Sequence, residues 1–78
     1  MLTASQIRSA RHALKLSVEQ LSQLSTVSVR TIKRMEAGNG IPSSTETNLL
    51  AVKSTFEAAG IEFIGTPDDG PGIRIHAK

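Results

Sequence analysis

The 78-residue sequence predicts a mainly α-helical domain, a bundle of four to five helices followed by a short C-terminal β-hairpin or strand pair. Between residues 4 and 59, apolar side chains recur at the spacing of amphipathic helices. Each expected helix follows a serine or threonine that can cap it. After Gly60 the apolar pattern changes to that of short strands. A chain of this length allows one domain with a modest core.

The first helix is expected from Ala4 to Leu14. Thr3 can accept a hydrogen bond from the first turn while the side chain of Gln6 reaches back, and the two together form a capping box. The apolar stripe of this helix consists of Ile7, Ala10 and Leu14. We expect that stripe to face the core.

The second helix is short and begins after Ser17, which can form a second capping box with Gln20. Leu21 and Leu24 are expected to form its buried stripe. Only two helical turns fit before residues 25–27 redirect the chain. Because helices this short are marginal in isolation, packing on other elements must stabilise this one.

The third helix, expected from Ser28 to Ala37, has one cationic and one apolar face. Ser28 can cap it and Gly38 can end it. At about 100° per residue, one arc consists of Val29, Arg30, Lys33, Arg34 and Ala37. The opposite arc consists of Thr31, Ile32, Met35 and Glu36. The cationic arc alone also fits an ordinary solvated helix. Two capped helices in such tight succession favour a helix-turn-helix, whose second helix enters a DNA groove.

The fourth helix is expected to begin with a capping box between Ser43 and Glu46 and to run to about Ala59. Its apolar stripe consists of Leu49, Val52 and Phe56. Gly60 ends it. The sequence leaves open whether this stretch is one long helix or two helices with a break.

Beyond the helices, residues 61–64 and 73–76 read as two strands, and residues 66–72 between them have the composition of a turn. A lone two-stranded ribbon is marginal in water. It must therefore cover the core of its own chain or join a sheet with a second chain, and both alternatives stay open. We accordingly divide the chain into a DNA-binding helix-turn-helix domain at residues 1–60 and a strand extension at residues 61–78, a candidate dimerisation element.

Charge is unevenly distributed along the chain. The first 40 residues contain six Lys and Arg against two Glu, a net charge of +4. Residues 41–78 contain three Lys and Arg against five Asp and Glu, a net charge of −2. A positive front half and a negative back half suit a protein that places one end on phosphate.

Several other classes of function find no support in the sequence. There is no cysteine, and His12 and His76 belong to no metal-ligand spacing. No nucleophile elbow, P-loop or dinucleotide fingerprint is present. We therefore expect no enzymatic activity, no catalytic residue, no metal and no cofactor. No apolar run is long enough for a signal peptide or a membrane span, so a membrane partner is not expected.

Residues 16–38, LSVEQLSQLSTVSVRTIKRMEAG, resemble the DNA-binding element of the phage repressor and Cro family, also called the XRE-type helix-turn-helix family. The similarity extends over residues 3 to about 60. Its most specific parts are the Leu-Ser opening, the VSxxTIxRxExG run that starts at Val27, and the segment from Pro42 to Leu50 that begins the next helix. The resemblance implies a lambda-repressor-like bundle. It also implies a cytoplasmic, nucleoid-associated regulator from a bacterium or phage, one that binds double-stranded DNA as a homodimer.

Three positions depart from the pattern of this family. The family usually has Gln where Val18 stands, and that Gln reaches the DNA backbone, so one expected DNA contact is missing. Ala is usual at Ser22, where the two helices touch. Gly is usual at Thr26, in the turn, so Thr26 must adopt a conformation that Gly takes more cheaply. None of the three changes the cationic face.

The resemblance also implies site residues. The expected base-contacting residues are Val29, Arg30, Lys33 and Arg34. Among them, Arg30 suits a bidentate contact with guanine, Val29 a thymine methyl group, and Arg34 either a phosphate or a base. The expected phosphate-contacting residues are Arg11, Ser17, Ser28 and Asn39. A structural ion pair is expected between Arg11 and Glu36, the alternative being a solvated Glu36.

The function that follows is sequence-specific DNA binding by a repressor-like transcriptional regulator, which reads the major groove with its third helix. The alternative is an antitoxin or adaptor module whose main role is to bind a partner protein. The two functions are compatible, since antitoxins often repress their own operon. The sequence does not identify the operator.

Overall fold

The structure of the chain, a computed structural model, describes residues 2–38, 40–42, 44–66 and 68–76. Its elements are the helices α1 (Ala4–Ala13), α2 (Val18–Ser25), α3 (Val29–Glu36) and α4 (Glu46–Ala58), and the strands β1 (Ile61–Thr66) and β2 (Asp69–Ile75). The predicted helical bundle with a C-terminal strand pair is therefore confirmed. The stretch that was open to two interpretations is the single helix α4.

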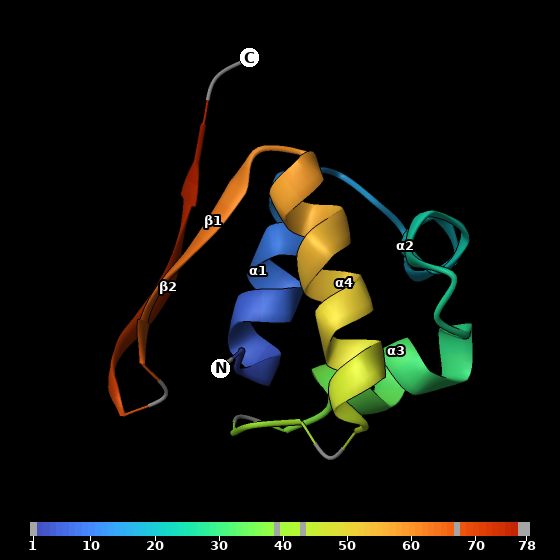
Figure 1. Cartoon of the computed structure of the whole chain (residues 1–78), viewed down its shortest axis with the longest axis horizontal. Coiled ribbons are helices and arrows are strands. Elements are labelled where there is room, and N and C mark those ends of the chain that lie inside the picture. Colours follow the sequence, from blue (N-terminus) through green and yellow to red (C-terminus); the bar gives the residue numbers. More distant parts are fainter. Residues whose placement is uncertain (1, 39, 43, 67, 77–78) are drawn as a thin grey trace.

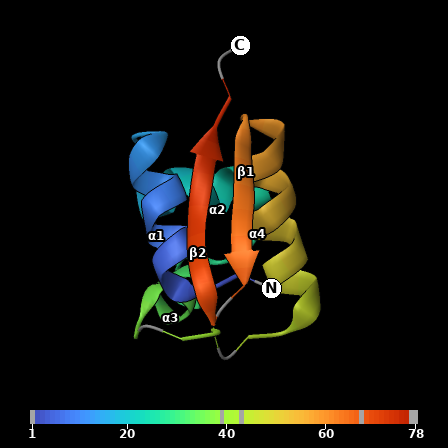
Figure 2. The same ribbon diagram turned by 90° about the vertical axis from the view of Figure 1, so that its left-hand side faces the viewer.

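The elements form three layers (Figure 1). α2 and α3 lie on one side, α1 and α4 occupy the middle, and the hairpin lies on the opposite side. Seen from the hairpin side, β2 runs next to α1 and β1 next to α4 (Figure 2). The hairpin thus covers the helices on the face that points away from α2 and α3.

The two predicted capping boxes at the starts of α1 and α2 are both present. In the first, Thr3 Oγ1 accepts from the Gln6 N–H at 3.2 Å, and Gln6 Oε1 accepts from the Thr3 N–H at 2.8 Å. In the second, Ser17 Oγ accepts from the Gln20 N–H at 3.0 Å, and Gln20 Oε1 accepts from the Ser17 N–H at 2.8 Å. These caps satisfy N–H groups that the first helical turn leaves without partners.

The start of α4 differs from the prediction. Its cap is Thr45, whose Oγ1 accepts from the Asn48 N–H at 3.2 Å. Ser43, the expected cap, lies outside the described residues. The Ser44 N–H donates to the Pro42 carbonyl at 3.1 Å, so Ser44 is not yet part of the helix. The helix therefore begins later than the sequence pattern indicates.

The core lies between the three layers and is built from every element except β2, which adds a half-buried residue at its edge. The buried apolar residues are Leu2, Ala4, Ile7, Ala10, Leu21, Val27, Ile32, Met35, Val52, Phe56 and Ile61. The half-buried apolar residues packed against them are Leu14, Val18, Leu49, Ala51, Phe63 and Ile73. The predicted stripes of the first and fourth helices thus face the core.

Leu24 was expected in the core, and that prediction is wrong, because its side chain is 62% exposed. The buried line of α2 passes from Leu21 to Ser25, four residues further on, and leaves Leu24 to one side. Ser25 can be buried because its hydroxyl donates to the Leu21 carbonyl at 2.8 Å and accepts from the Val27 N–H at 3.2 Å. A satisfied polar group costs little in a core.

The two strands pair with each other, antiparallel, within the chain. The rings of Phe63 and Phe56 pack edge to face with centroids 6.0 Å apart, and Ile61 is 2% exposed. At the bulge, a Cβ on Gly65 would lie 2.3 Å from the Gly70 carbonyl oxygen, so this position requires glycine. The hairpin completes the core of its own chain, which is the first of the two alternatives that the sequence leaves open. Its role in dimerisation stays a prediction.

Gln6 joins the hairpin to α1. Its side chain is almost fully buried, with the residue 3% exposed. While Oε1 serves the capping box, Nε2 donates to the Ile64 carbonyl at 3.1 Å and to the Gly72 carbonyl at 2.9 Å. One amide therefore contacts both strands, and the capping box fixes its orientation. The sequence assigns Gln6 to the cap only, because its strand partners are 58 and 66 residues away.

Candidate nucleic-acid interface

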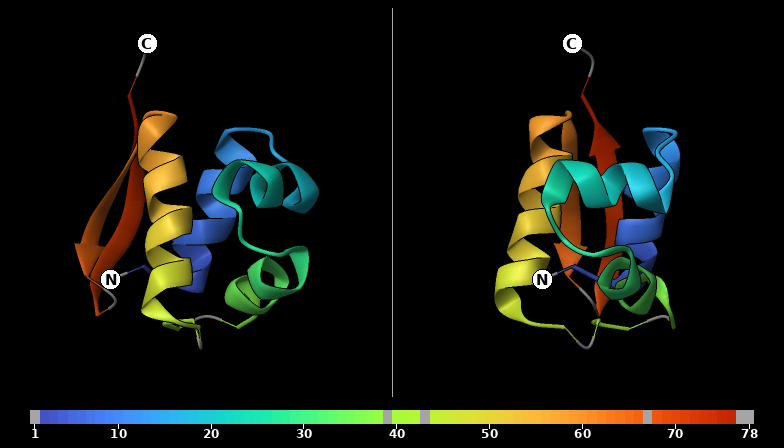
Figure 3. Two further views of the ribbon diagram at one scale, coloured as in Figure 1. Left: turned by 45° about the vertical axis from the view of Figure 1, so that its right-hand side comes forward. Right: turned by 90° about the vertical axis from the view of Figure 1, so that its right-hand side faces the viewer.

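α2 and α3 form a compact unit on the side of the molecule opposite the hairpin (Figure 3). The turn between them depends on Thr26, which ends α2 with φ 63° and ψ 13°. This is the left-handed conformation. It was predicted because the family usually has glycine at the position of Thr26. It costs a non-glycine residue roughly 1–2 kcal/mol. Val27, 4% exposed, anchors the turn in the core.

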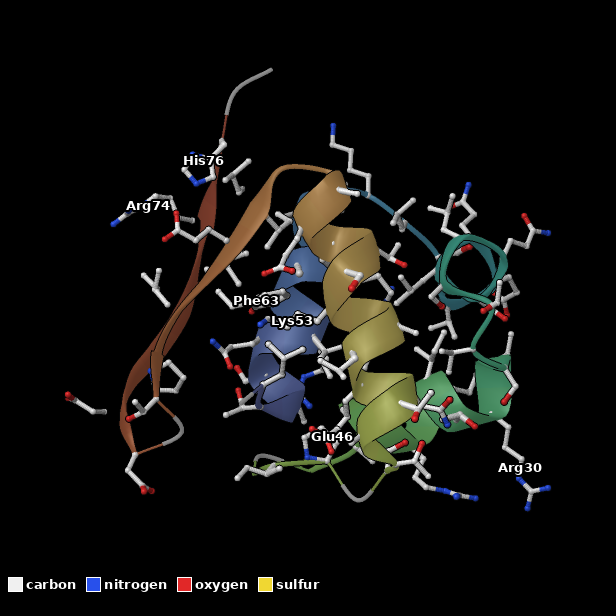
Figure 4. All side chains as sticks on the ribbon, in the orientation of Figure 1. Arg30, Glu46, Lys53, Phe63, Arg74 and His76 are labelled. Atoms are coloured by element: carbon white, nitrogen blue, oxygen red, sulfur yellow. The ribbon has the colours of Figure 1, made fainter. Side chains whose placement is uncertain are left out.

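α3 has the two faces that its sequence predicts. Ile32 and Met35 are fully buried. Arg30, Lys33 and Arg34 are exposed, and within the described residues none of the three side chains has a hydrogen-bond or ion-pair partner. Arg30 extends away from the body of the molecule (Figure 4). The helix thus presents three uncompensated positive charges to solvent, with the half-buried Val29 beside them.

The ion pair between Arg11 and Glu36 is present and joins α1 to the end of α3. Arg11 Nε donates to Glu36 Oε2 at 2.7 Å and Nη2 to Oε1 at 2.9 Å. The side chains are 14% and 9% exposed. These hydrogen bonds, with the negative charge of Glu36, raise the pKa of Arg11 above its usual value, although burial acts in the opposite direction. The remaining amino group, Nη1, donates to the Leu16 carbonyl at 3.0 Å.

Arg8 is a second anchor of α3, and the sequence reasoning missed it. Its Nη1 donates to the carbonyl oxygens of Glu36 and Gly38, the latter at 2.8 Å. Carbonyls at the end of a helix have no intrahelical partners, and a cation there also complements the helix dipole. The sequence shows that Arg8 shares a face of α1 with Arg11, three residues later, but it does not show the carbonyl groups that Arg8 reaches.

The N-termini of α2 and α3 are both capped by exposed serines. Ser17 Oγ accepts from the Gln20 N–H. Ser28 Oγ accepts from the Thr31 N–H at 3.2 Å and lies 2.9 Å from Thr31 Oγ1. Helix N-termini favour phosphate through their free N–H groups and the helix dipole. Asn39, the fourth expected phosphate contact, lies outside the described residues.

A polar depression separates α3 from the start of α4. It is lined by Thr31, Arg34, Ser44, Thr45 and Asn48. Arg34 therefore lies at the edge of α3 nearest to α4, whereas Arg30 extends from the first turn of α3. The cations of α3 thus occupy different parts of one continuous surface.

Within the described part of the chain, no group of three or more His, Cys, Asp or Glu side chains could hold a metal ion. His76 Nε2 lies 2.7 Å from Glu62 Oε1, in an exposed pair on the hairpin. None of the helices in these ranges combines the length and the apolar character needed to cross a membrane.

A comparison with models of protein families matches residues 7–51 to a family described as helix-turn-helix. The match covers more than half of the chain and runs from α1 into α4, so it includes the whole of α2 and α3. Comparisons with curated proteins and with solved structures gave no match.

Proposed function

Because this chain belongs to the XRE-type helix-turn-helix family of DNA-binding transcription regulators, we propose that it binds specific double-stranded DNA sequences as a repressor-like regulator. The proposal places α3 in the major groove. The observation that supports it best is the exposed face of α3, where Arg30, Lys33 and Arg34 have no partner among the described residues.

In this proposal, residues in the first turn of α3 read the bases. The first turn of a recognition helix approaches the base edges most closely. Arg30 makes the bidentate contact with guanine, and Val29 contacts a thymine methyl group. Lys33, one turn after Val29 on the same face, reaches a base or the groove wall. The buried face, with Ile32 and Met35, holds the helix on the core.

The phosphate contacts come from the edges of the same surface. The Ser17 hydroxyl only accepts a hydrogen bond, from the Gln20 N–H, within the described residues. Its proton can therefore be donated to a phosphate. The Ser28 hydroxyl donates to Thr31 Oγ1, so it can donate to a phosphate once that hydrogen bond is broken. Arg34, beside the polar depression at the start of α4, is better placed for phosphate than for a base. Arg11 is the remaining candidate in this set: it donates three of its five N–H groups to Glu36 and Leu16, which leaves one N–H on each of Nη1 and Nη2 for a phosphate.

The working unit in this proposal is a homodimer on a roughly two-fold symmetric site. One α3 of eight residues contacts few base pairs. Specific affinity at physiological salt usually needs a second half-site, with centres about 10 base pairs apart. Two copies related by a two-fold axis match such a site.

The test is the selection of bound fragments from a random duplex pool, followed by binding measurements with Arg30→Ala on the selected site and on single-base variants of it. Loss of the guanine contact should cost about 1–3 kcal/mol and relax preference at one position. Arg74→Ala, on the far hairpin, is the matched control and should change neither. A loss that is equal for all sequences would contradict the base-reading role. Enrichment of no duplex would favour the partner-protein alternative.

A further inference from the structure

Large apolar side chains are exposed around α4. In the described ranges the exposed ones near α4 are Leu24 (62%), Ile41 (48%) and Leu50 (52%), whereas Ile75 (60%) lies apart from them at the end of β2. Ile41 and Leu50 line one groove of about 340 Å³, on the hairpin side of α4, together with Pro42 and Leu49. Leu24 lines a second groove on the other side of α4. Ile41 and Leu50 expose apolar surface in one groove, and apolar surface gathered in one place marks interaction sites more often than scattered single residues do.

The outward face of α4 is not covered by any described part of the chain. Val52 and Phe56 face the core, whereas Thr47, Leu50 and Ser54 are exposed. In Figure 1 this helix lies in front, with the hairpin on one side of it and α2 and α3 on the other. A partner can therefore approach α4 without displacing the hairpin or α3.

We propose that this face of α4 binds a second copy of the chain, with the two α4 helices antiparallel about a two-fold axis beside Leu50. The inference deepens the proposed function, on which it rests, because it names the surface that forms the dimer on a two-fold DNA site. The exposed Leu50 of each copy is buried at the centre, and the groove beside it receives the partner helix.

The charges on α4 favour a second copy as the occupant. Glu46 lies four residues before Leu50 and Lys53 three residues after it, and both line the groove on the hairpin side. In an antiparallel pair whose two-fold axis passes between positions 49 and 50, Glu46 lies opposite the partner subunit's Lys53, and the symmetry repeats this contact. Glu46 has no ion-pair partner among the described residues, and the pair that Lys53 makes, with Glu57, is long at 3.8 Å. The face is thus complementary to itself.

The position of this face also suits DNA binding. A two-fold axis that passes beside α4, from the hairpin side to the side of α2 and α3, leaves both α3 helices on the same side of the dimer (Figures 1 and 3). Two successive major grooves on one face of a duplex require that arrangement.

Charge reversal tests the interface with the full chain. In a homodimer of Glu46→Lys, lysines at positions 46 and 53 of opposite subunits would face each other. In a homodimer of Lys53→Glu, glutamates would face each other at the same two positions. Each variant alone should weaken the dimer by on the order of tenfold or more, since like charges across an interface repel. An equal mixture of the two variants restores both opposite-charge contacts. Sedimentation equilibrium should therefore find a heterodimer close to wild-type strength.

Arg74→Glu is the matched control, because it reverses a charge on the exposed face of the hairpin. It should leave the dimer constant unchanged. Weakening by this variant alone would place the interface on the hairpin and overturn the proposal. A wild-type chain that stays monomeric, single variants that dimerise normally, or a mixture that fails to recover would overturn it as well. Recovery in the mixture also shows that both variants are folded.

The two proposals can fail separately, because the dimer is measured without DNA. A chain that passes the charge-reversal test but enriches no duplex retains the interface and loses the proposed function. A chain that selects a half-site through Arg30 but never dimerises retains the DNA-binding role and loses the interface.

Discussion

Arg11 of α1 and Glu36, the last residue of α3, are joined by two hydrogen bonds of 2.7 and 2.9 Å. Both side chains are largely shielded from solvent. The pair ties the proposed recognition helix to a helix that has no part in base contact. Together with the hydrogen bonds from Arg8 to the end of α3, it fixes the direction in which the cations of α3 point.

Glu36→Gln should destabilise the fold by about 2 kcal/mol, because it leaves the Arg11 charge shielded and without its partner. Arg11→Lys keeps the charge but cannot form the paired contact, so it should also destabilise. Urea unfolding of both variants measures this. Unchanged midpoints together with unchanged DNA affinity would show that the pair has no structural role.

The same pair should not make stability depend on pH near neutrality. The hydrogen bonds with Glu36 raise the folded-state pKa of Arg11 above its usual value. Its stabilisation is therefore fully present below the unfolded-state value and is lost only as the pH rises through the higher folded-state value. The loss of stability in Glu36→Gln should accordingly be the same at about pH 7 and about pH 9. Thermal melting at the two pH values checks this, and a difference that shrinks at the higher pH would contradict it.

Gln6→Glu should loosen the hairpin. The substitution keeps an oxygen for the Thr3 N–H but replaces the donor Nε2 by a second oxygen, which then faces the carbonyls of Ile64 and Gly72. The cost is about 1–3 kcal/mol for buried polar groups left without partners. Hydrogen exchange should accelerate in β1 and β2 more than in α3. Equal acceleration throughout the chain would mean that Gln6 stabilises the fold only as a whole.

Thr26→Gly should stabilise the protein by about 1 kcal/mol, because Thr26 adopts a left-handed conformation that glycine takes without steric cost. Thr26→Ala is the matched control. Both substitutions remove the hydroxyl that donates to the Ser25 carbonyl, but only glycine removes Cβ. A gain with alanine equal to that with glycine would assign the effect to the side chain instead of the backbone.

Phe63→Ala should destabilise the chain by about 2–3 kcal/mol, since the Phe63 ring packs on Phe56 and adjoins the core. Ile75→Ala changes a residue of the same hairpin that is 60% exposed. It should stay within about 0.5 kcal/mol of wild type. Denaturant unfolding measures both losses of stability. If the hairpin were only attached to the core and did not complete it, the free energy of unfolding would change little in either variant.

The parts of the fold that depend on neighbouring residues could be predicted from the sequence. The capping boxes at Thr3 and Ser17 and the two faces of α3 follow from residues three or four positions apart, which meet on any helix. The strained turn at Thr26 followed from comparison with a family pattern, and so did the pair of Arg11 with Glu36.

The parts that failed depend on contacts that no local pattern contains. Leu24 has helical spacing from Leu21, but the rest of the fold covers α2 along the line to Ser25. The second role of Gln6 requires two strands that are remote in sequence. Arg8 is local to Arg11, but its carbonyl partners at the end of α3 appear only after α1 and α3 have packed together.

The affinity for a selected duplex, measured across a range of salt concentrations, tests the central claim most directly, namely that the cationic face of α3 binds DNA. The chain with Arg30→Ala, Lys33→Ala and Arg34→Ala should lose specific binding, and its salt slope should fall by about one for each phosphate contact removed. Arg74→Ala should keep both the wild-type affinity and the wild-type slope. If the triple variant bound the duplex with unchanged affinity and salt slope, α3 would not be the DNA-binding element.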